Sequence, residues 1–202
     1  MDLVADIGAT NARFQYSVDG VLDGQPMVLP TQKFKQGAAL LEAAHQALGA
    51  EHCEHALFGV AGPASHANDI EITNTGLLIS AEDGARGLGC KTWLANDFVA
   101  LAHGVPYFHA LRQLGGCAID LSQPPANKAL LGPGSGLGMA TVIPQTGLEL
   151  WRVVASEGGH ADLAPGSHLE IELWGVLMEQ HQHVCWDTVL CGPGLENLHQ
   201  AM

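Results

Sequence analysis

Positive charge is scarce in this chain. Its 202 residues include 8 Lys and Arg against 21 Asp and Glu, which gives a formal net charge of −13 at pH 7. So acidic a surface repels nucleic acids and anionic membranes, and neither is expected as a partner. Because few cations are available, we expect bound phosphate to be held by backbone N–H groups, helix N-termini and Mg²⁺.

Long apolar runs, a basic segment before the first strand-like residues and C-x-x-C motifs are also missing. No apolar run reaches the ~18 residues of a membrane-spanning helix, although 47% of the residues are apolar and can form a sizeable core. Strand-like sequence starts at Leu3 without a basic segment before it, so no signal peptide is expected. The five cysteines are scattered and form no C-x-x-C, which is typical of reduced thiols in a cytosolic protein. We therefore expect a cytoplasmic location.

The first half of the chain reads as three strands followed by alternating helices and strands. The runs 3–7 and 11–18 predict a β-hairpin, and a third strand is expected around 26–34. A helix is expected over 38–48, with Gly49 as its C-terminal stop. The remaining expected elements are strands at 56–61, 69–73 and 92–95 and helices at 80–87 and 98–103.

The second half opens in the same way but stops sooner. It has expected strands at 129–132, 139–143 and 148–154, then helices at 169–181, 187–190 and from 195 onward. The later strands of the first half have no counterpart, so we expect a truncated chain. The sequence predicts an α/β fold of two related βββαβα-type domains, 1–108 and 109–202, the second incomplete.

Two turns of small residues follow strand-like runs and suit phosphate. The first, Ile7-Gly8-Ala9-Thr10-Asn11, offers backbone N–H groups and the Thr10 hydroxyl, and Asp6 beside it can hold a hydrated Mg²⁺. The second spans Gly132 to Gly138. It lacks the ending of a Walker A loop, and a strand follows it, not the helix of a dinucleotide fingerprint. Two such turns predict a nucleotide held between two related domains.

Polar side chains suited to catalysis or ligand binding follow two other strands. Asn96-Asp97 ends a buried strand, where ligands bind in open α/β sheets. A carboxylate there can take the proton of a hydroxyl that attacks phosphorus, although Asp97 is equally suited to capping a helix. Glu157-Gly158-Gly159-His160 is either a turn that binds a polyhydroxylated ligand or an ordinary exposed turn. Asp187, at the start of an expected helix, is ordinarily a cap.

Together these segments resemble the bacterial glucokinases of the actin/hexokinase/Hsp70 ATPase superfamily, which has a ribonuclease H-like fold. Ala9 stands where that family usually has glycine, and the zinc-site cysteines of the related repressor/kinase families are absent. The resemblance rests on five segments in order: Asp6-Ile7-Gly8-Ala9-Thr10-Asn11-Ala12-Arg13, Leu94-Ala95-Asn96-Asp97-Phe98, Gly134-Ser135-Gly136-Leu137-Gly138, Glu157-Gly158-Gly159-His160-Ala161-Asp162-Leu163-Ala164-Pro165 and 189–198.

The resemblance implies an ATP-dependent hexokinase that phosphorylates the 6-hydroxyl of glucose, the first step of glycolysis. Asp97 becomes the general base. The implied sugar ligands are Asn96, Asp97, Glu157, His160 and Asp187, the last in place of the family's usual glutamate. Implied ATP contacts are Ala5, Asp6, Ile7, Gly8, Ala9, Thr10, Asn11, Arg13, Gly134, Ser135 and Gly136. Asp6 is implied to hold Mg²⁺ through water.

Two other functions stay open. A non-catalytic sugar-binding or regulatory protein would keep the sugar site and lack the adenosine pocket. An actin-like or chaperone-type ATPase would have no sugar site, which Asn96-Asp97 and Glu157-x-x-His160 argue against. The family continues past Met202 with its adenosine-binding motif, so residues 1–202 alone are expected to bind ATP poorly. The sequence fixes neither the sugar, nor the phosphoryl donor, nor whether the protein is a homodimer.

Overall fold

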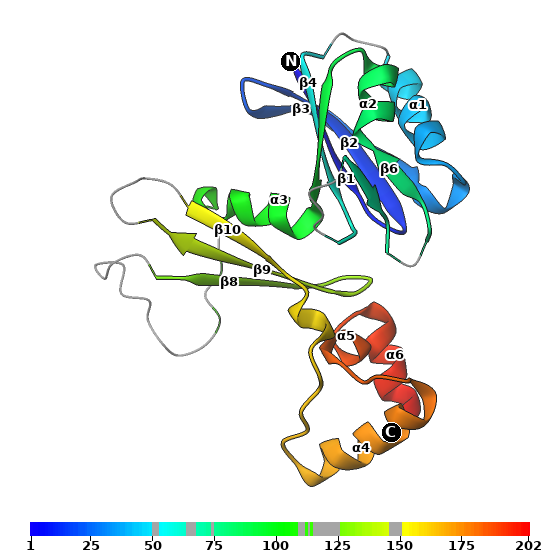
Figure 1. Ribbon diagram of the computed structural model, residues 1–202, viewed down its shortest axis with the longest axis vertical. Helices are drawn as coiled ribbons and strands as arrows, with labels where there is room; N and C mark the ends of the chain where they lie inside the picture. Colours follow the sequence, from blue (N-terminus) through cyan, green and yellow to red (C-terminus); the bar gives the residue numbers. More distant parts are fainter. Residues whose placement is uncertain are drawn as a thin grey trace. The chain divides into compact units, whose positions relative to one another are not determined.

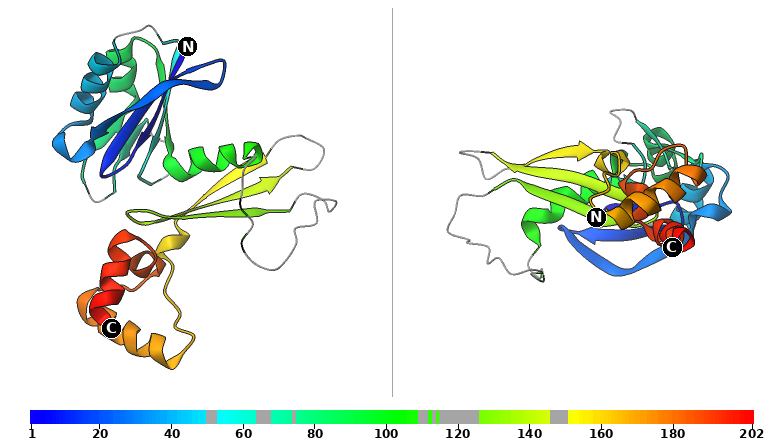
Figure 2. Two further views of the ribbon diagram at one scale, coloured as in Figure 1. Left: turned by 180° about the vertical axis from the view of Figure 1, so that it is seen from behind. Right: turned by 90° about the horizontal axis from the view of Figure 1, so that it is seen from below.

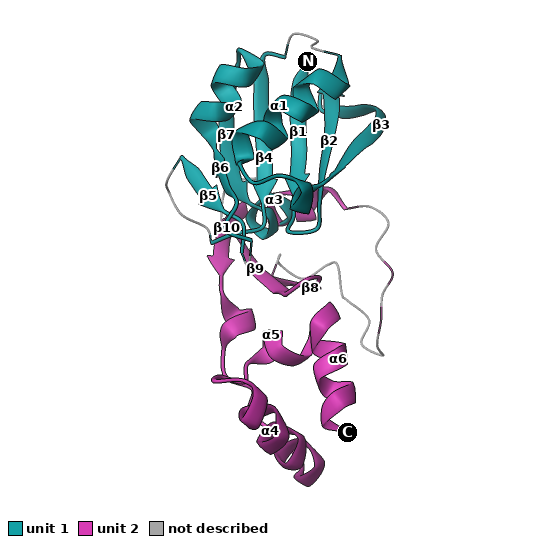
Figure 3. Cartoon of the chain, turned by 90° about the vertical axis from the view of Figure 1, so that its right-hand side faces the viewer, with its two compact units in different colours: residues 1–101 teal, residues 102–202 magenta. Residues whose placement is uncertain are grey.

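The computed structural model describes residues 1–49, 53–63, 68–73, 75–108, 112, 114, 126–145 and 151–202. The chain divides into two compact units, 1–101 and 102–202 (Figure 3). A domain boundary after residue 108 stays a prediction, because residues 109–111 lie outside the described part. Each unit has its own sheet and its own apolar cluster.

Unit 1 is built on a five-stranded sheet (Figure 1), and its strand order β3-β2-β1-β4-β7 can be followed in Figure 3. The strands β1 (Asp2–Ile7), β2 (Asn11–Val18) and β3 (Val21–Pro30) form an antiparallel meander. The strands β4 (His55–Val60) and β7 (Lys91–Asn96) extend it in parallel with β1. Because parallel strands end at the same edge, the segments after β1, β4 and β7 meet there.

The third strand starts earlier than its sequence pattern predicts. Asp19 and Gly20 both have positive φ, 51° and 78°, and form the tight turn between β2 and β3. β3 therefore begins at Val21 rather than near residue 26, and Thr31–Lys33 form the 3-10 helix η1 instead of strand. Most residues of β3 are exposed, so its sequence shows little alternation of apolar and polar residues. Such a strand start is hard to recognise from the sequence.

The helices α1 (Gly37–Leu48) and α2 (Ala81–Leu88) cover one face of this sheet (Figure 3). Beneath them lies the main core, where the rings of Phe14 and Phe58 meet edge to face with centroids 6.1 Å apart. A third helix, α3 (Asp97–Gly104), leaves the carboxyl end of β7, and the short η2 (Val105–Tyr107) follows it. The small strands β5 (Asp69–Glu71) and β6 (Leu78–Ser80) pair with each other, and β6 is a strand that was not predicted.

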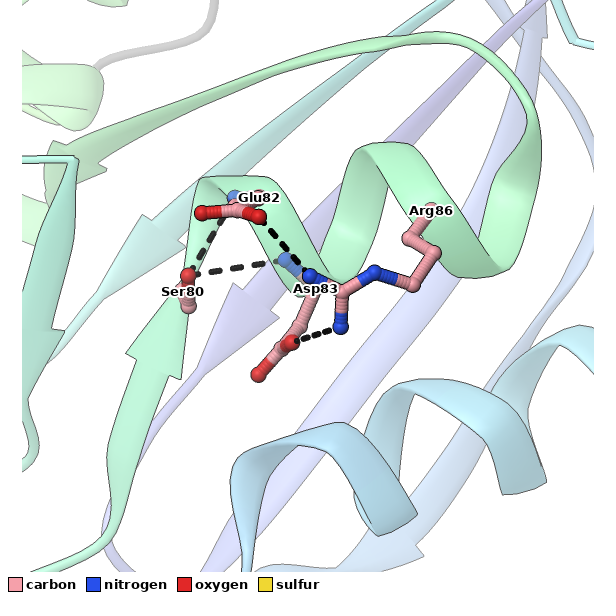
Figure 4. Close-up of polar contacts among 4 residues, drawn as sticks. All are labelled: Ser80, Glu82, Asp83 and Arg86. Atoms are coloured by element: carbon pink, nitrogen blue, oxygen red, sulfur yellow. Dashed lines mark hydrogen bonds and ion pairs between the residues drawn. The ribbon is translucent and has the colours of Figure 1, made fainter.

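The predicted N-terminal cap of α2 is confirmed. The Ser80 hydroxyl accepts the N–H groups of Glu82 and Asp83 at 3.2 and 3.5 Å (Figure 4). Both acidic side chains also pair with Arg86, at 2.8 and 3.0 Å. The helix runs past Gly87 to Leu88 and is capped by Gly89, whose φ of 68° is one that glycine adopts without strain.

The sheet of unit 2 is a second antiparallel meander, made of β8 (Lys128–Pro133), β9 (Leu137–Pro144) and β10 (Trp151–Ser156) (Figure 2). Its order β10-β9-β8 repeats the order β3-β2-β1 of unit 1. Residues 148–150 of the expected third strand lie outside the described part. The α/β fold with two related openings is confirmed, and no further strand joins this sheet among the described residues.

Helices complete unit 2. They are the 3-10 helix η3 (Gly158–His160), α4 (His168–Gln180), α5 (Trp186–Val189) and α6 (Gly192–Ala201). Leu177, Val184 and Val189 form their small buried cluster. α6 begins at Gly192 rather than at residue 195, because Pro193 needs no N–H partner in the first turn. None of the helices in the described part is long and apolar enough to cross a membrane.

Candidate functional site

The turn after β1 is the tight hairpin that the sequence predicts. The Gly8 N–H donates to the Asn11 carbonyl at 3.0 Å and closes the turn. The Thr31 N–H donates to the Thr10 carbonyl at 3.0 Å and ties the turn to the end of β3. Thr10 itself is exposed, whereas the Ile7 side chain is buried in the core. Of the predicted nucleotide contacts, Ile7 can thus offer only backbone atoms.

Asp6 and Arg13 lie opposite each other on β1 and β2. Arg13 Nη1 is 3.2 Å from Asp6 Oδ2, and both side chains are more than half exposed. An ion pair so exposed to solvent contributes little to stability and is readily rearranged. The Asp6 carboxylate therefore stays accessible at the carboxyl edge of the sheet, next to the first turn.

Asn96 fixes the junction between β7 and α3. Its Oδ1 accepts the Val99 N–H at 3.0 Å, which caps the first turn of the helix. Its Nδ2 donates to the Gly62 carbonyl at 2.7 Å and to Asp97 Oδ1 at 3.1 Å. The capping role that the sequence offered to Asp97 thus belongs to Asn96.

Asp97 is the first residue of α3, and its Oδ1 accepts the N–H of Phe98 at 2.9 Å. It lines a pocket of about 430 Å³ whose walls come entirely from unit 1. The lining includes Asp6, so the structure brings the predicted base and the predicted Mg²⁺ ligand to one cavity. The full lining is Ala5, Asp6, Gly59, Asp97, Phe98, Ala100 and Leu101.

Gly59 was missed by the sequence reasoning, which treated it as part of a buried strand. A Cβ at this position would lie 3.5 Å from the Asp97 Cα and the Ala100 Cβ, and 3.6 Å from the Ala5 carbonyl. The absence of a side chain thus keeps the floor of the pocket open between β1 and α3. A glycine inside an apolar strand is a known sign of close approach by a ligand or by backbone.

The second predicted phosphate turn connects β8 and β9. The Gly134 N–H donates to the Gly136 carbonyl at 2.7 Å, and the Gly192 N–H donates to the Gly134 carbonyl at 2.9 Å. The start of α6 therefore holds this turn from outside. Ser135 lies at its tip and is exposed.

Asp187 holds the other side of the same turn. Its Oδ1 accepts the N–H of Leu137, the first residue of β9. A Cβ at Gly136 would lie 2.7 Å from this oxygen, so no other residue fits there without movement. The structure thus places Asp187, an expected sugar ligand, directly against the predicted phosphate turn.

The Glu157–His160 segment follows β10 as the 3-10 helix η3 with its cap. The Ser156 hydroxyl accepts the Gly158 N–H at 3.1 Å, and the His160 N–H donates to the Glu157 carbonyl at 3.0 Å. Gly159 is buried, while the side chains of Glu157 and His160 are exposed. The two predicted sugar-binding side chains are therefore presented to solvent by a well-bonded turn.

Leu137 links these segments of unit 2 through its backbone. Its N–H is bonded to Asp187, and a Cβ at Gly159 would lie 2.2 Å from its carbonyl oxygen. The Glu157–His160 turn thus packs against the strand that leaves the phosphate turn. Leu137 was not singled out from the sequence, because a backbone contact leaves no side-chain signal.

Comparison with known proteins decides the family. The sequence model of the glucokinase family matches residues 3–202. The chain belongs to the glucokinase family. The glucokinase of Chromobacterium violaceum is 35% identical over 204 residues, which cover 99% of this chain and 57% of that relative. The chain thus spans little more than half the length of this glucokinase.

Solved structures of glucokinases share the fold. The glucokinase of an Antarctic psychrotroph aligns with a TM-score of 0.70 and 30% identity, covering 99% of this chain and 63% of that one. A ROK family glucokinase of Streptomyces griseus, solved with glucose and AMPPNP, aligns with a TM-score of 0.63, covering 96% and 58%. At 19% identity the second likeness shows the fold alone.

Proposed function

We propose that the protein transfers the terminal phosphoryl group of ATP to the 6-hydroxyl of glucose. The observation that carries this proposal is the shared pocket of Asp97 and Asp6 at the carboxyl edge of the unit 1 sheet. Membership of the glucokinase family and the glucose and AMPPNP bound to the Streptomyces relative support it.

Asp97 is proposed as the general base. Its Oδ1 is bonded to Phe98 and Asn96, which fixes the orientation of the carboxylate at the pocket. A fixed carboxylate can accept the proton of the sugar hydroxyl as that oxygen attacks phosphorus. Phosphoryl transfer has a loose transition state, so positioning and a mild base suffice.

The two glycine-containing turns are proposed to hold the ATP phosphates by their backbone. Asp6 is proposed to hold Mg²⁺ through water. One accessible carboxylate fits this ion, because Mg²⁺ keeps several waters and takes its other ligands from phosphate oxygens. When bound, Mg²⁺ neutralises phosphate charge. Release of Asp6 from Arg13 costs little because their ion pair is exposed.

Glu157 and His160 are proposed to bind sugar hydroxyls, because both are exposed on a turn that is rigidly bonded. Asn96 has little hydrogen-bonding capacity left for a sugar. Both hydrogens of its amide have acceptors within unit 1, so it offers a sugar only the second lone pair of Oδ1. Asp187 is proposed to hold the phosphate turn with Oδ1 and to accept a sugar hydroxyl with its second oxygen.

The proposed reaction places the protein in the cytoplasm, where ATP is available. The test is a coupled assay in which glucose 6-phosphate reduces NADP, with ATP, ADP or polyphosphate as the donor. It is run on the product of the whole reading frame and on residues 1–202. Glucose binding is measured separately by calorimetry, so that a protein that binds sugar without turnover is recognised as the non-catalytic alternative.

The variant that tests the mechanism is Asp97→Asn. Asparagine keeps an oxygen for the Phe98 N–H, so the helix start is retained. Loss of the base is expected to lower kcat by about 10²–10⁴-fold and to leave glucose affinity nearly unchanged. The control is Asp162→Asn, another carboxylate, which is exposed and paired with His183. Turnover of Asp97→Asn within about tenfold of the parent would refute the assignment.

A further inference from the structure

Two cysteines that are far apart in sequence meet at the amino edge of the unit 1 sheet. Cys53 precedes β4 and Cys90 precedes β7, and these neighbouring strands pair in parallel with His55 opposite Lys91. The two Sγ atoms lie 3.1 Å apart although the positions are separated by 37. The cysteines that looked scattered along the chain therefore include a pair in space.

The two thiols of this pair differ in access. Cys53 is 2% exposed and belongs to the main core, whereas Cys90 is partly exposed and packs against that core. Burial, and then contact with Cys53, raises the pKa of the Cys90 thiol from 9.0 to about 12. Small molecules can therefore reach Cys90 first, and its thiolate is scarce at neutral pH.

The other described cysteines have different surroundings. Cys185 Sγ lies 3.4 Å from the Thr188 hydroxyl at the start of α5. Cys191 Sγ accepts the Gly194 N–H at 3.1 Å at the start of α6. Within the described part of the chain, the contact between two sulfur atoms is thus specific to unit 1.

We propose that Cys53 and Cys90 are a modification site, which a small-molecule disulfide of the glutathione type converts into an intrachain disulfide bond. First, the Cys90 thiolate attacks one sulfur of the reagent and displaces one glutathione thiolate. The Cys53 thiolate then attacks the Cys90 sulfur, the bond between the two cysteines forms, and the second glutathione thiolate leaves. The protein loses two electrons and two protons, and the reagent takes them up as two thiols.

The geometry suits this reaction. The two sulfurs must approach by only about 1 Å to reach bonding distance. The bond would join the amino ends of β4 and β7, whereas Gly59 and Asp97 lie at the carboxyl ends. The length of a six-residue strand, roughly 20 Å, separates the bond from the pocket. The bond is therefore expected to stabilise unit 1 and to leave ligand binding there unchanged, whatever the function of the pocket.

The test uses reduced protein equilibrated at pH 8.5 with glutathione disulfide and glutathione. A second sample is refolded from guanidinium in the same buffer, so that every thiol is accessible before the fold selects a partner. Peptide mass spectrometry is expected to find Cys53 linked to Cys90 in both samples. The midpoint of thermal unfolding is expected to rise by roughly 5–10 °C.

Two variants and one control decide the outcome. Cys90→Ser and Cys53→Ala should abolish the linked peptide and the thermal shift, while Cys185→Ser should keep both. Cys53 is buried, so its replacement can prevent folding. In that case the result for Cys90→Ser decides the outcome by itself. The proposal is overturned if glutathione stays on Cys90 as a mixed disulfide that Cys53 does not displace. It is also overturned if refolding yields no preferred Cys53–Cys90 link, or if oxidised wild type and Cys90→Ser unfold at the same temperature.

Discussion

Asp187 offers a direct test of how the second phosphate turn is held. Its carboxylate accepts the Leu137 N–H, and this charged hydrogen bond joins α5 to the first residue of β9. Removing the acceptor in Asp187→Ala leaves the N–H without this partner. A hydrogen bond to a charged group contributes about 1.5–3 kcal/mol, and Leu137 is only partly buried, so we expect a loss of about 2 kcal/mol.

The same reasoning grades the substitutions at this position. Asp187→Asn keeps a neutral acceptor and should lose about 1 kcal/mol, because a neutral hydrogen bond contributes about half as much. Asp187→Glu keeps the charge, but its added methylene has little room beside Gly136, where a Cβ would already lie 2.7 Å from the carboxylate. We expect the loss of stability in Asp187→Glu to lie between the losses in the asparagine and alanine variants.

Amide hydrogen exchange measures this bond at one atom. In Asp187→Ala the protection of the Leu137 N–H should fall by about 30-fold, the equivalent of about 2 kcal/mol. Protection of β2 amides in unit 1 should stay unchanged. Asp162→Asn serves as the matched control, because its carboxylate is 88% exposed and, within the described part of the chain, pairs with the exposed His183. Equal Leu137 protection in Asp187→Ala and wild type would refute the assigned bond.

Three further predictions concern the Glu157–His160 turn, the unit 1 pocket and Cys90. Glu157→Gln and His160→Ala should each weaken glucose binding by about one to two decades and leave nucleotide binding unchanged; equal affinity in calorimetry would remove the turn from the sugar site. Gly59→Leu should fill the pocket floor and abolish turnover while unit 1 stays folded by circular dichroism, and retained turnover would exclude that pocket. Because the folded state raises the pKa of Cys90 from 9.0 to about 12, the unfolded chain loses this proton first. Stability should therefore fall as pH rises from about 9 to 12, and less steeply in Cys90→Ser, as denaturation midpoints will show.

Local sequence signals predicted most of the fold. As predicted, α1 stops at Gly49, which has a positive φ, and Ser80 begins α2 through its hydroxyl; the stop of α2 at Gly89 instead of Gly87 was not predicted. These signals succeed because the physical cause lies within a few residues of the effect. The start of β3 and the strand β6 escaped prediction, since both depend on pairing with another strand rather than on their own composition.

The site shows the same division. Asp97, Glu157 and His160 could be proposed from the sequence because their side chains carry chemistry and stand next to strand ends or glycines. Their proposed roles await the experiments above. Gly59 and Leu137 were missed because they act by an absent side chain and by backbone atoms, which only three-dimensional packing reveals.

The bonds around Leu137 have a consequence for how ligands act on unit 2. Asp187 bonds its N–H, Gly159 packs against its carbonyl, and it begins the strand that leaves the phosphate turn. No gap of the size of a Cβ separates the Glu157–His160 turn from this strand. A shift of the turn on binding a sugar should therefore move the strand as well. Movement of the strand is then passed to the phosphate turn, whose other end is held by Gly192 at the start of α6. Binding at the two segments should therefore be thermodynamically coupled, and by reciprocity each ligand should change the affinity of the other by the same factor.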